Sequence, residues 1–270
     1  MPRPGAPVLV MGVVNVTPDS FSDGGRFVDH AAALAHARAL IAQGADLLDI
    51  GGESTRPGAT PVAAAEEIAR VVPLIAALRA ESAVPISIDT MKPAVARAAV
   101  DAGAGVWNDV TALGFSPEAP ALAAELGCEV VLMHMQGEPA TMQAAPHYED
   151  VVGEVCGFLA GRAEAAIAAG VARERIWLDP GIGFGKTLAH NLALLSQLER
   201  LVALDFPVLL GASRKSFLRA LDPAAADPVC RLGGSLAAAL AGAGAGVAAV
   251  RVHDVAETVQ ALRVWAAIRA

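Results

Sequence analysis

Short apolar runs alternate with alanine-rich helical segments along the whole chain. Eight runs rich in Val, Ile and Leu occupy residues 8–14, 47–50, 85–88, 106–109, 129–133, 176–179, 208–211 and 247–252. Amphipathic segments lie between them, for example residues 30–43, 63–80, 94–102, 151–169, 191–204 and 255–268. Apolar strands separated by helices are typical of a parallel sheet that helices cover. The pattern predicts one α/β domain over residues 1–270, a closed (β/α)8 TIM barrel with long loops after its first two strands.

The composition excludes several classes of protein. A net charge of −8 argues against nucleic acid as the main partner. The uncharged run 232–250 contains five glycines and a serine, so it is better explained by a helix, a turn and a buried strand than by a membrane span. The N-terminus has no signal-peptide pattern. Cys128, Cys156 and Cys230 are widely spaced, which indicates neither disulfides nor a zinc site, and we expect a reducing, cytoplasmic setting.

Polar residues follow every predicted strand. In barrels of this kind the carboxyl ends of the strands meet at one mouth and carry function. Helix caps could account for any one of these residues, but the whole ring predicts a polar site for a ligand with many hydrogen-bonding edges and some negative charge. In chain order they are Asn15; Glu53, Ser54, Thr55 and Arg56; Asp89 and Thr90; Asn108 and Asp109; His134; Asp179; Ser213, Arg214 and Lys215; and Arg251, His253 and Asp254.

Two loops at this mouth are unusual. Residues 15–25, NVTPDSFSDGG, are long and polar and carry the aromatic Phe21. Since βα loops usually have two to six residues, we expect a mobile lid here. Residues 49–59, DIGGESTRPGA, offer backbone N–H groups, hydroxyls and the guanidinium of Arg56 to an anionic or planar ligand.

Two further motifs favour a flat heterocycle. Asp89 accepts hydrogen bonds and Asn108 both donates and accepts, so together they can hold a ring with adjacent N–H and C=O groups. The alternative for Asp89 is a helix cap, because Pro93 follows closely. Residues 178–187, LDPGIGFGKT, are not a P-loop, since Pro180 stands where a glycine is needed. Their glycines let the backbone approach a flat ligand that Phe184 could line.

The chain has only three lysines, and each follows a strand-like run: Lys92, Lys186 and Lys215. This placement predicts a function for at least one of them. Lys215 could form a Schiff base or act as a cation, and the polar residues near it in the sequence and on the next strand favour the cation. His134 is better explained as a buried, hydrogen-bonded histidine than as a ligand. Gly242, Gly244 and Gly246 miss the dinucleotide-binding pattern and are expected to turn a helix into the last strand.

Taken together, the motifs resemble those of the dihydropteroate synthase family of the folate pathway, the target of sulfonamides. The matching segments occur in family order and cover all eight units: MGVVNVTPDSFSDGG, DIGGESTRPGA, SIDT, NDV, LMHMQG, LDPGIGFGK, SRKSFL and RVHDV. The resemblance implies a transferase that condenses 6-hydroxymethyl-7,8-dihydropterin pyrophosphate with p-aminobenzoate, giving 7,8-dihydropteroate and pyrophosphate. It also implies Mg²⁺ as cofactor, inhibition by sulfonamides, and a homodimer.

The same resemblance implies roles for individual residues. Asp89, Lys215 and Arg251 would be the catalytic residues. The pterin would contact Asp89, Asn108, Asp179 and Lys215, with Met133 packing on the ring and Arg251 stacking on its face. Asn15 would meet Mg²⁺ and the pyrophosphate, joined by Arg251 and His253. The p-aminobenzoate end would be shaped by Thr55, Arg56, Pro57, Phe184 and Ser216, with Phe21 reaching in from the first loop.

The residue chemistry fits this reaction. Departure of pyrophosphate would leave a carbocation delocalised into the pterin, which the anion of Asp89 would stabilise. Three alternatives remain at this point: a pterin-dependent methyltransferase, a Schiff-base aldolase acting through Lys215, and a catalytically inactive pterin-binding protein. The methyltransferase has no need of the STRPGA, SRKSFL and RVHDV segments, and intact Asn15, Arg56 and Arg251 argue against loss of catalysis.

Overall fold

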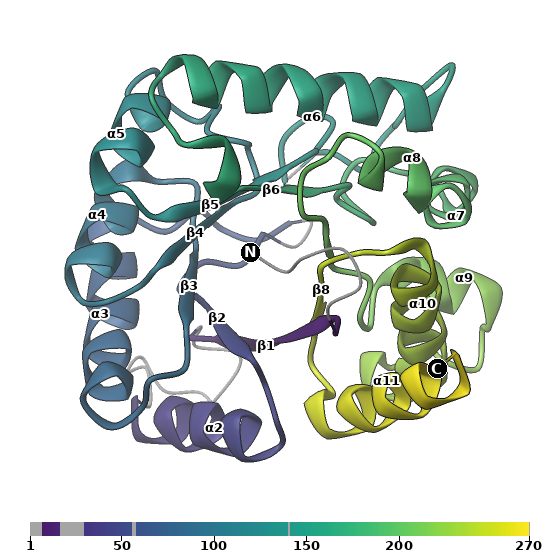
Figure 1. Cartoon of the computed structure of the whole chain (residues 1–270), viewed down its shortest axis with the longest axis horizontal. Helices are drawn as coiled ribbons and strands as arrows, with labels where there is room; N and C mark the ends of the chain where they lie inside the picture. Colours follow the sequence, from purple (N-terminus) through teal and green to yellow (C-terminus); the bar gives the residue numbers. More distant parts are fainter. Residues whose placement is uncertain (1–6, 17–29, 56–57, 140, 270) are drawn as a thin grey trace.

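A computed structural model describes residues 7–16, 30–55, 58–139 and 141–269 of the chain. Eight parallel strands form one sheet in the order β6-β5-β4-β3-β2-β1-β8-β7. In Figure 1 the strands surround a common centre and the helices lie outside them. The strands are β1 (Leu9–Asn15), β2 (Leu47–Gly51), β3 (Ile86–Asp89), β4 (Val106–Asp109), β5 (Glu129–Met133), β6 (Ile176–Asp179), β7 (Leu209–Leu210) and β8 (Ala249–Val252).

The ends of this sheet meet between β6 and β7. A parallel bridge joins Leu178 to Val208, and the backbone N–H of Leu178 donates to the carbonyl of Pro207 at 2.9 Å. The sheet is therefore a nearly closed barrel, which confirms the predicted fold. The predicted strand 208–211 was too long, because regular pairing here covers only the two residues of β7.

The helices follow the strands in the alternation expected from the sequence. They are α2 (His30–Ala42), α3 (Ala64–Glu81), α4 (Pro93–Asp101), α5 (Ala119–Leu126), α6 (Val151–Ala168), α7 (Leu188–Ser196), α8 (Leu198–Val202), α9 (Ser216–Leu221), α10 (Leu232–Ala245) and α11 (Val255–Arg269). Short 3-10 turns lie at η1 (Arg173–Arg175) and η2 (Pro228–Arg231). The single helix predicted over 191–204 is wrong, because Gln197 leaves the helical conformation and divides it into α7 and α8.

The glycine-rich run 232–250 forms a helix, a turn and a strand, as predicted. Gly246 ends α10 with a φ of +90°, a conformation that glycine adopts without strain. Gly242 and Gly244 were expected in the turn but lie inside α10. A Cβ at Gly242 would come within 2.6 Å of Leu210 Cδ2, so this glycine lets the helix pack closely on β7. Among the described residues, no helix has the length and apolar character needed to cross a membrane.

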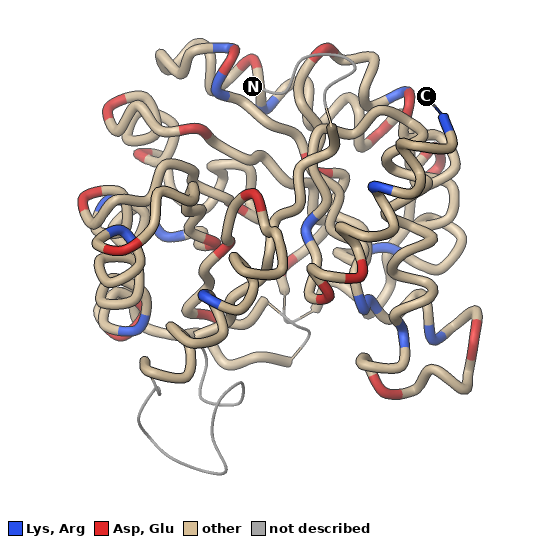
Figure 2. Tube along the Cα trace, turned by 60° about the horizontal axis from the view of Figure 1, so that its bottom comes forward, with Lys and Arg blue, Asp and Glu red and all other residues tan. Residues whose placement is uncertain are grey.

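The two faces of the sheet have separate apolar clusters. Side chains on the outer face pack beneath the helices, for example Ile50, Ile88 and Leu132. A smaller cluster fills the barrel interior: Met11, Leu47, Val106, Val131, Trp177, Leu209 and Ala249. Successive side chains of a strand point to opposite faces, so each strand contributes to both clusters. Outside the barrel, Lys and Arg residues lie interspersed with Asp and Glu residues (Figure 2).

Candidate active site

A polar layer lies directly above the apolar interior of the barrel. Residues two positions apart on a strand share a face. Beyond the interior residues Leu47, Val106, Trp177 and Ala249, the next residues on the same face are Asp49, Asn108, Asp179 and Arg251. Strand pairing places Asp89 beside Asn108 and beside Gly51. The fold thus gathers acidic, amide and cationic side chains at the carboxyl ends of the strands.

Arg251 is held by two carboxylates from strands far away in the sequence. Its Nε donates to Asp49 Oδ2 at 2.5 Å, and its Nη2 donates to Asp89 Oδ2 at 2.8 Å. Asn108 Nδ2 donates to the same Asp49 oxygen at 3.1 Å. Burial disfavours the charge of Arg251, but Asp49 and Asp89 outweigh it and raise the pKa of the guanidinium. Arg251 is therefore a fixed cation on the inner wall.

Asp49 was not among the site residues predicted from the sequence. Its side chain is fully buried, and its second oxygen, Oδ1, makes no hydrogen bond to any described residue. It was missed because it lies in the middle of β2 and not at the strand's end. An aspartate between Leu48 and Ile50 in a buried strand was the available signal, since a charge there requires a partner.

Asp89 ends β3 and faces the interior of the barrel. Burial is the largest influence on the pKa of Asp89 and raises it to about 7. The positive charge of Arg251 lowers this pKa, and the negative charge of Asp49 raises it further. The alternative role as a helix cap is not supported, because Lys92 is the N-cap residue of α4. Asp109, the next residue after Asn108, does serve a local turn, accepting from the backbone of Thr111 at 2.7 Å and of Leu113 at 2.9 Å.

Two glycines at strand ends leave room for this layer. A Cβ at Gly51 would lie 3.5 Å from Asp89 Cβ and 3.8 Å from Asn15 Oδ1. A Cβ at Gly211 would lie 3.7 Å from Asp179 Oδ2 and 3.9 Å from Arg251 Cβ. Asn15 and Asp89 therefore flank one open position, and Asp179 and Arg251 flank another.

Lys215 faces the loop after β6. Its ammonium donates to the carbonyl of Ile182 and lies 4.4 Å from the ring centre of Phe184. Burial lowers the pKa of Lys215 to about 8, while Asp179 works in the opposite direction. Asp179 in turn accepts from the backbone of Gly181 at 2.7 Å. Lys215, Phe184 and Asp179 therefore form one wall of the site.

The loop after β6 is fixed to the end of β5. A Cβ at Gly181 would come within 1.9 Å of the His134 carbonyl and 3.3 Å of Met133 Cγ, and Gly181 has a φ of +64°, so only glycine fits there. The ammonium of Lys186 is buried and donates to the carbonyls of Gly181 and Phe184 at 3.0 Å. Burial lowers the pKa of Lys186 to about 7. Lys186 holds this loop against β5.

His134 is a buried structural residue, as predicted. Its Nδ1 lies 2.9 Å from Lys186 Nζ, and its ring packs edge-on against Phe158 at 4.9 Å between centres. Burial, reinforced by the charge of Lys186, lowers the pKa of His134 to about 3. A neutral imidazole in this position accepts a hydrogen bond from the lysine.

The structure describes three of the remaining predicted residues, His253, Thr55 and Ser216, and leaves others outside the described ranges. His253 Nδ1 lies 3.0 Å from Ser213 Oγ, which joins the ends of β7 and β8. Thr55 is half-buried after β2, and Ser216 is exposed at the first turn of α9. Within the described ranges, no hydrogen bond joins either of them to the Arg251 cluster. Phe21, Arg56 and Pro57, with most of the expected lid, lie outside the described residues.

A metal ion would find few protein ligands here. Among the described residues, no group of three or more His, Cys, Asp or Glu side chains could hold one. Mg²⁺ usually takes one or two protein oxygens and completes its shell with water and substrate phosphates. The amide oxygen of Asn15 beside Gly51 fits an ion of that kind.

Comparison with known proteins identifies relatives that match most of the chain. Residues 11–253 match the family described as "Pterin binding enzyme". The chain is 48% identical over 255 residues to dihydropteroate synthase of Escherichia coli strain K12, covering 94% of this chain and 89% of the relative.

Solved structures are equally similar. Dihydropteroate synthase of Xanthomonas albilineans with 4-aminobenzoic acid has a TM-score of 0.92 and 53% identity, covering 98% of this chain and 94% of that one. The same enzyme with 7,8-dihydropteroate has a TM-score of 0.89 and 50% identity at the same coverage. The Yersinia pestis enzyme in complex with a sulfonamide drug has a TM-score of 0.92 and 46% identity, covering 97% and 94%.

Proposed function

The chain belongs to the dihydropteroate synthase family of pterin-binding enzymes, and we propose how its residues divide the work of that transferase. The reaction joins 6-hydroxymethyl-7,8-dihydropterin pyrophosphate to p-aminobenzoate and releases pyrophosphate. The observation that carries the proposal is the polar layer around Arg251, which is set on an apolar barrel floor. A flat ring with several N–H and C=O groups suits such a layer.

In this proposal the pterin lies against the ends of β3, β4, β6 and β8. The carboxylates of Asp89 and Asp179 accept from ring N–H groups, while Asn108 and Lys215 meet acceptors. Met133, paired with Asp179 across β5 and β6, contributes an apolar face. Arg251 stacks on the ring because its guanidinium is already fixed by Asp49 and Asp89.

The pyrophosphate lies near Asn15, Arg251 and His253, where positive charge and donors gather. Mg²⁺, when bound, would neutralise the leaving group, with the amide oxygen of Asn15 as the protein ligand. Arg251 remains cationic throughout, since its pKa is raised. His253, held by Ser213, offers a ring nitrogen at the same end of the barrel.

The p-aminobenzoate end is formed by Phe184 and Ser216 together with Thr55 of the loop after β2. Arg56, Pro57 and Phe21 complete it in the proposal, although they lie outside the described residues. Phe184 is half-buried beside Lys215, which gives this end an aromatic face and a cation for a carboxylate.

The proposed order of events starts with the leaving group. The C–O bond between the pterin methylene and pyrophosphate breaks, and the electron pair leaves with the phosphate oxygen. The methylene carbon becomes a cation delocalised into the ring, and the anion of Asp89 stabilises it. The amine of p-aminobenzoate then forms the C–N bond and releases one proton to solvent. Since p-aminobenzoate is a weak nucleophile, forming the electrophile first lowers the barrier of the second step.

Release of pyrophosphate tests this function directly. It should require both substrates in full turnover, and Asp89→Asn should lower the rate while the pterin substrate still binds. If pyrophosphate is released equally fast without charge at position 89, the carbocation role is wrong.

Three coarser properties complete the proposal. A single domain is supported by the one eight-stranded sheet. A reducing, cytoplasmic setting rests on the sequence, in which Cys128, Cys156 and Cys230 are odd in number and widely spaced. A homodimer rests on the family resemblance, and sedimentation at several protein concentrations would test it.

A further inference from the structure

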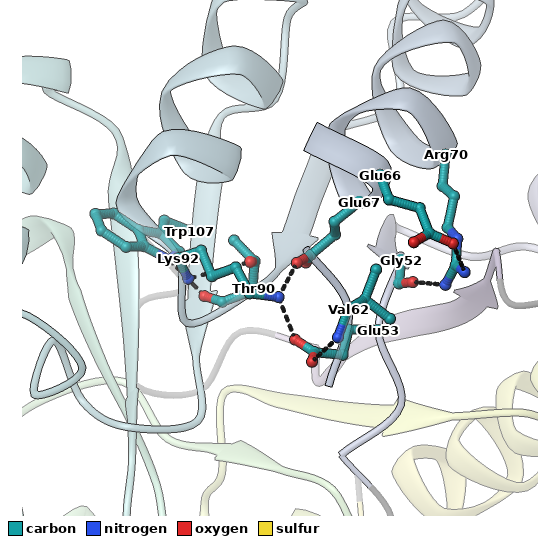
Figure 3. Close-up of polar contacts among 9 residues, drawn as sticks. All are labelled: Gly52, Glu53, Val62, Glu66, Glu67, Arg70, Thr90, Lys92 and Trp107. Carbon is teal, nitrogen blue, oxygen red and sulfur yellow. Dashed lines mark hydrogen bonds and ion pairs between the residues drawn. The ribbon is translucent and has the colours of Figure 1, made fainter. Parts of the chain in front are cut away.

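A buried ion cluster joins the loop between β2 and α3 to the first turn of α3 and to the segment that follows β3 (Figure 3). The ammonium of Lys92 is 2.6 Å from Glu53 Oε2 and 2.6 Å from Glu67 Oε2. The side chains are 13%, 7% and 0% exposed, in the order Lys92, Glu53, Glu67. Ion pairs this far from water are screened little, so each contact restrains its partners.

Glu53 spans the loop with its two oxygens. While Oε2 meets Lys92, Oε1 accepts from the backbone N–H of Val62 at 2.9 Å. The side chain therefore ties the start of the loop to its end and to the β3 side of the barrel. Thr55, the residue placed at the p-aminobenzoate end, lies between these two tied points.

Lys92 is itself held in place. Its backbone N–H donates to Thr90 Oγ1 at 3.2 Å, and the carbonyl of Thr90 accepts from Trp107 Nε1 at 2.7 Å. Thr90 directly follows Asp89 at the end of β3. The chain of contacts thus runs from the pterin side of the site to the loop after β2.

A second tie fixes only the start of this loop. Arg70 of α3 donates to the carbonyl of Gly52 at 2.7 Å and to Glu66 at 2.5 Å. Because Arg70 holds Gly52 without Glu53, the ion cluster is not needed to anchor the end of β2. What the cluster adds is the contact to Val62.

The cluster contains two carboxylates but only one cation. Burial opposes the charge of Lys92, but the carboxylates of Glu53 and Glu67 outweigh it and raise the pKa of the ammonium. One cation serves both acids, and Glu67 Oε1 makes no hydrogen bond among the described residues. Glu67 thus shares Lys92 with Glu53, but among the described residues no hydrogen bond joins its carboxylate to the loop.

We propose that Lys92, acting through Glu53, is a positioning residue for p-aminobenzoate: the pair holds Thr55 and the two described ends of the loop after β2 in the arrangement that receives this substrate. The inference rests on the proposed assignment of Thr55 to the p-aminobenzoate end. It gives Lys92 a role that requires no contact with either substrate.

Glu53→Gln is the sharpest test. Glutamine keeps the shape but has one acceptor oxygen, so it can serve Lys92 or Val62 and not both. The KM for p-aminobenzoate should rise about tenfold, the scale of one hydrogen bond to a charged group, while the KM for the pterin substrate stays within about twofold. Lys92→Met should do the same. If that variant fails to fold, Glu53→Gln still decides, because the Lys92–Glu67 pair is kept.

Glu67→Gln is the matched control. It removes a carboxylate from the same lysine but leaves the Glu53–Val62 contact in place, so the KM for p-aminobenzoate should change by less than about twofold. Arg97→Met is a second control, because it breaks an exposed ion pair between Arg97 of α4 and Glu125 of α5. Equal effects of Glu53→Gln and Glu67→Gln, or no effect of Glu53→Gln, would overturn the proposal.

Thr55→Ala separates this inference from the function on which it rests. If Thr55→Ala raises the KM for p-aminobenzoate and Glu53→Gln does not, the positioning role alone is wrong. If neither variant changes that KM, the assignment of the loop to p-aminobenzoate is wrong, and the inference fails with it.

Discussion

Arg251 donates a hydrogen bond to Asp89 at 2.8 Å across the barrel interior, although 162 residues separate the two in sequence. The same guanidinium also meets Asp49. One cation therefore serves two buried carboxylates, which explains why burial and the charge of Asp49 can still raise the pKa of Asp89. The site is poised with an acidic group that ionises near neutral pH.

Asp49 should control the ionisation of Asp89. Asp49→Asn removes a nearby negative charge, so the pKa of Asp89 should fall and the acidic limb of the profile of kcat/KM against pH should move to lower pH. The rate itself should drop by roughly tenfold, because Arg251 loses a charged partner. An acidic limb that stays in place in this variant would contradict the coupling.

The profile of kcat/KM for the pterin substrate should be bell-shaped. Asp89 loses its negative charge as pH falls below about 7, and Lys215 loses its positive charge as pH rises above about 8. Both charged forms are needed in the proposed mechanism, so the maximum lies between the two values. Asp89→Asn should abolish the acidic limb and Lys215→Met the alkaline limb. If a limb remains after its residue has been substituted, another group is responsible for that ionisation.

Lys215 should contribute to binding of the pterin pyrophosphate. Lys215→Ala should weaken the affinity by about 1.5–3 kcal/mol, the range for hydrogen bonds to charged groups. Titration calorimetry measures the loss, and Arg97→Ala on the outer helix α4 is the control for a change of net charge. Unchanged affinity in the Lys215 variant counts against its place in the site.

Binding of the two substrates should be ordered. The proposed p-aminobenzoate end draws on two glycine-rich loops. The contacts of Glu53 and Arg70 already hold the loop after β2, but bringing the long loop after β1 to a substrate costs conformational entropy. Pterin and pyrophosphate should supply charge contacts that offset this cost, so p-aminobenzoate or a sulfonamide should bind the free protein weakly and the protein with both ligands far better.

Calorimetric titration of p-aminobenzoate with and without pyrophosphate tests this order. Equal affinity in the two titrations contradicts it. Substitutions at Phe21 or Pro57 should weaken a sulfonamide more than p-aminobenzoate, because the bulkier drug extends toward those loops.

Much of the site follows from local sequence because barrel geometry is simple. Once the strands are located, their carboxyl ends must meet at one mouth, and this rule predicts that Asp89, Asn108, Asp179 and Arg251 lie together. This rule does not predict Asp49, because Asp49 lies two residues before the end of β2, on the inner face of the strand. Its importance appears only when Arg251 of β8 is placed opposite.

The sequence alone does not show which of the three lysines lies in the site, because contacts between distant segments decide it. All three follow strands, but Lys186 is buried beneath backbone carbonyls and Lys92 pairs with Glu53 and Glu67, 39 and 25 residues away. Of the three, Lys215 lies beside Asp179 and Phe184. In the local sequence each lysine follows a strand, so the three look alike. Only the packing of distant segments distinguishes their roles.

Asp89→Asn tests the central claim most directly. The variant keeps the shape and removes the charge, so kcat measured by pyrophosphate release at saturating substrates should fall by roughly two orders of magnitude or more. The stability of the variant should not be lower than that of the wild type at pH 8. The pKa of Asp89 is higher in the folded state than in the unfolded state, so the wild-type protein loses stability when Asp89 ionises as pH rises through about 7. Asparagine at this position does not ionise and avoids that loss. A well-folded variant with near-normal kcat would contradict the account.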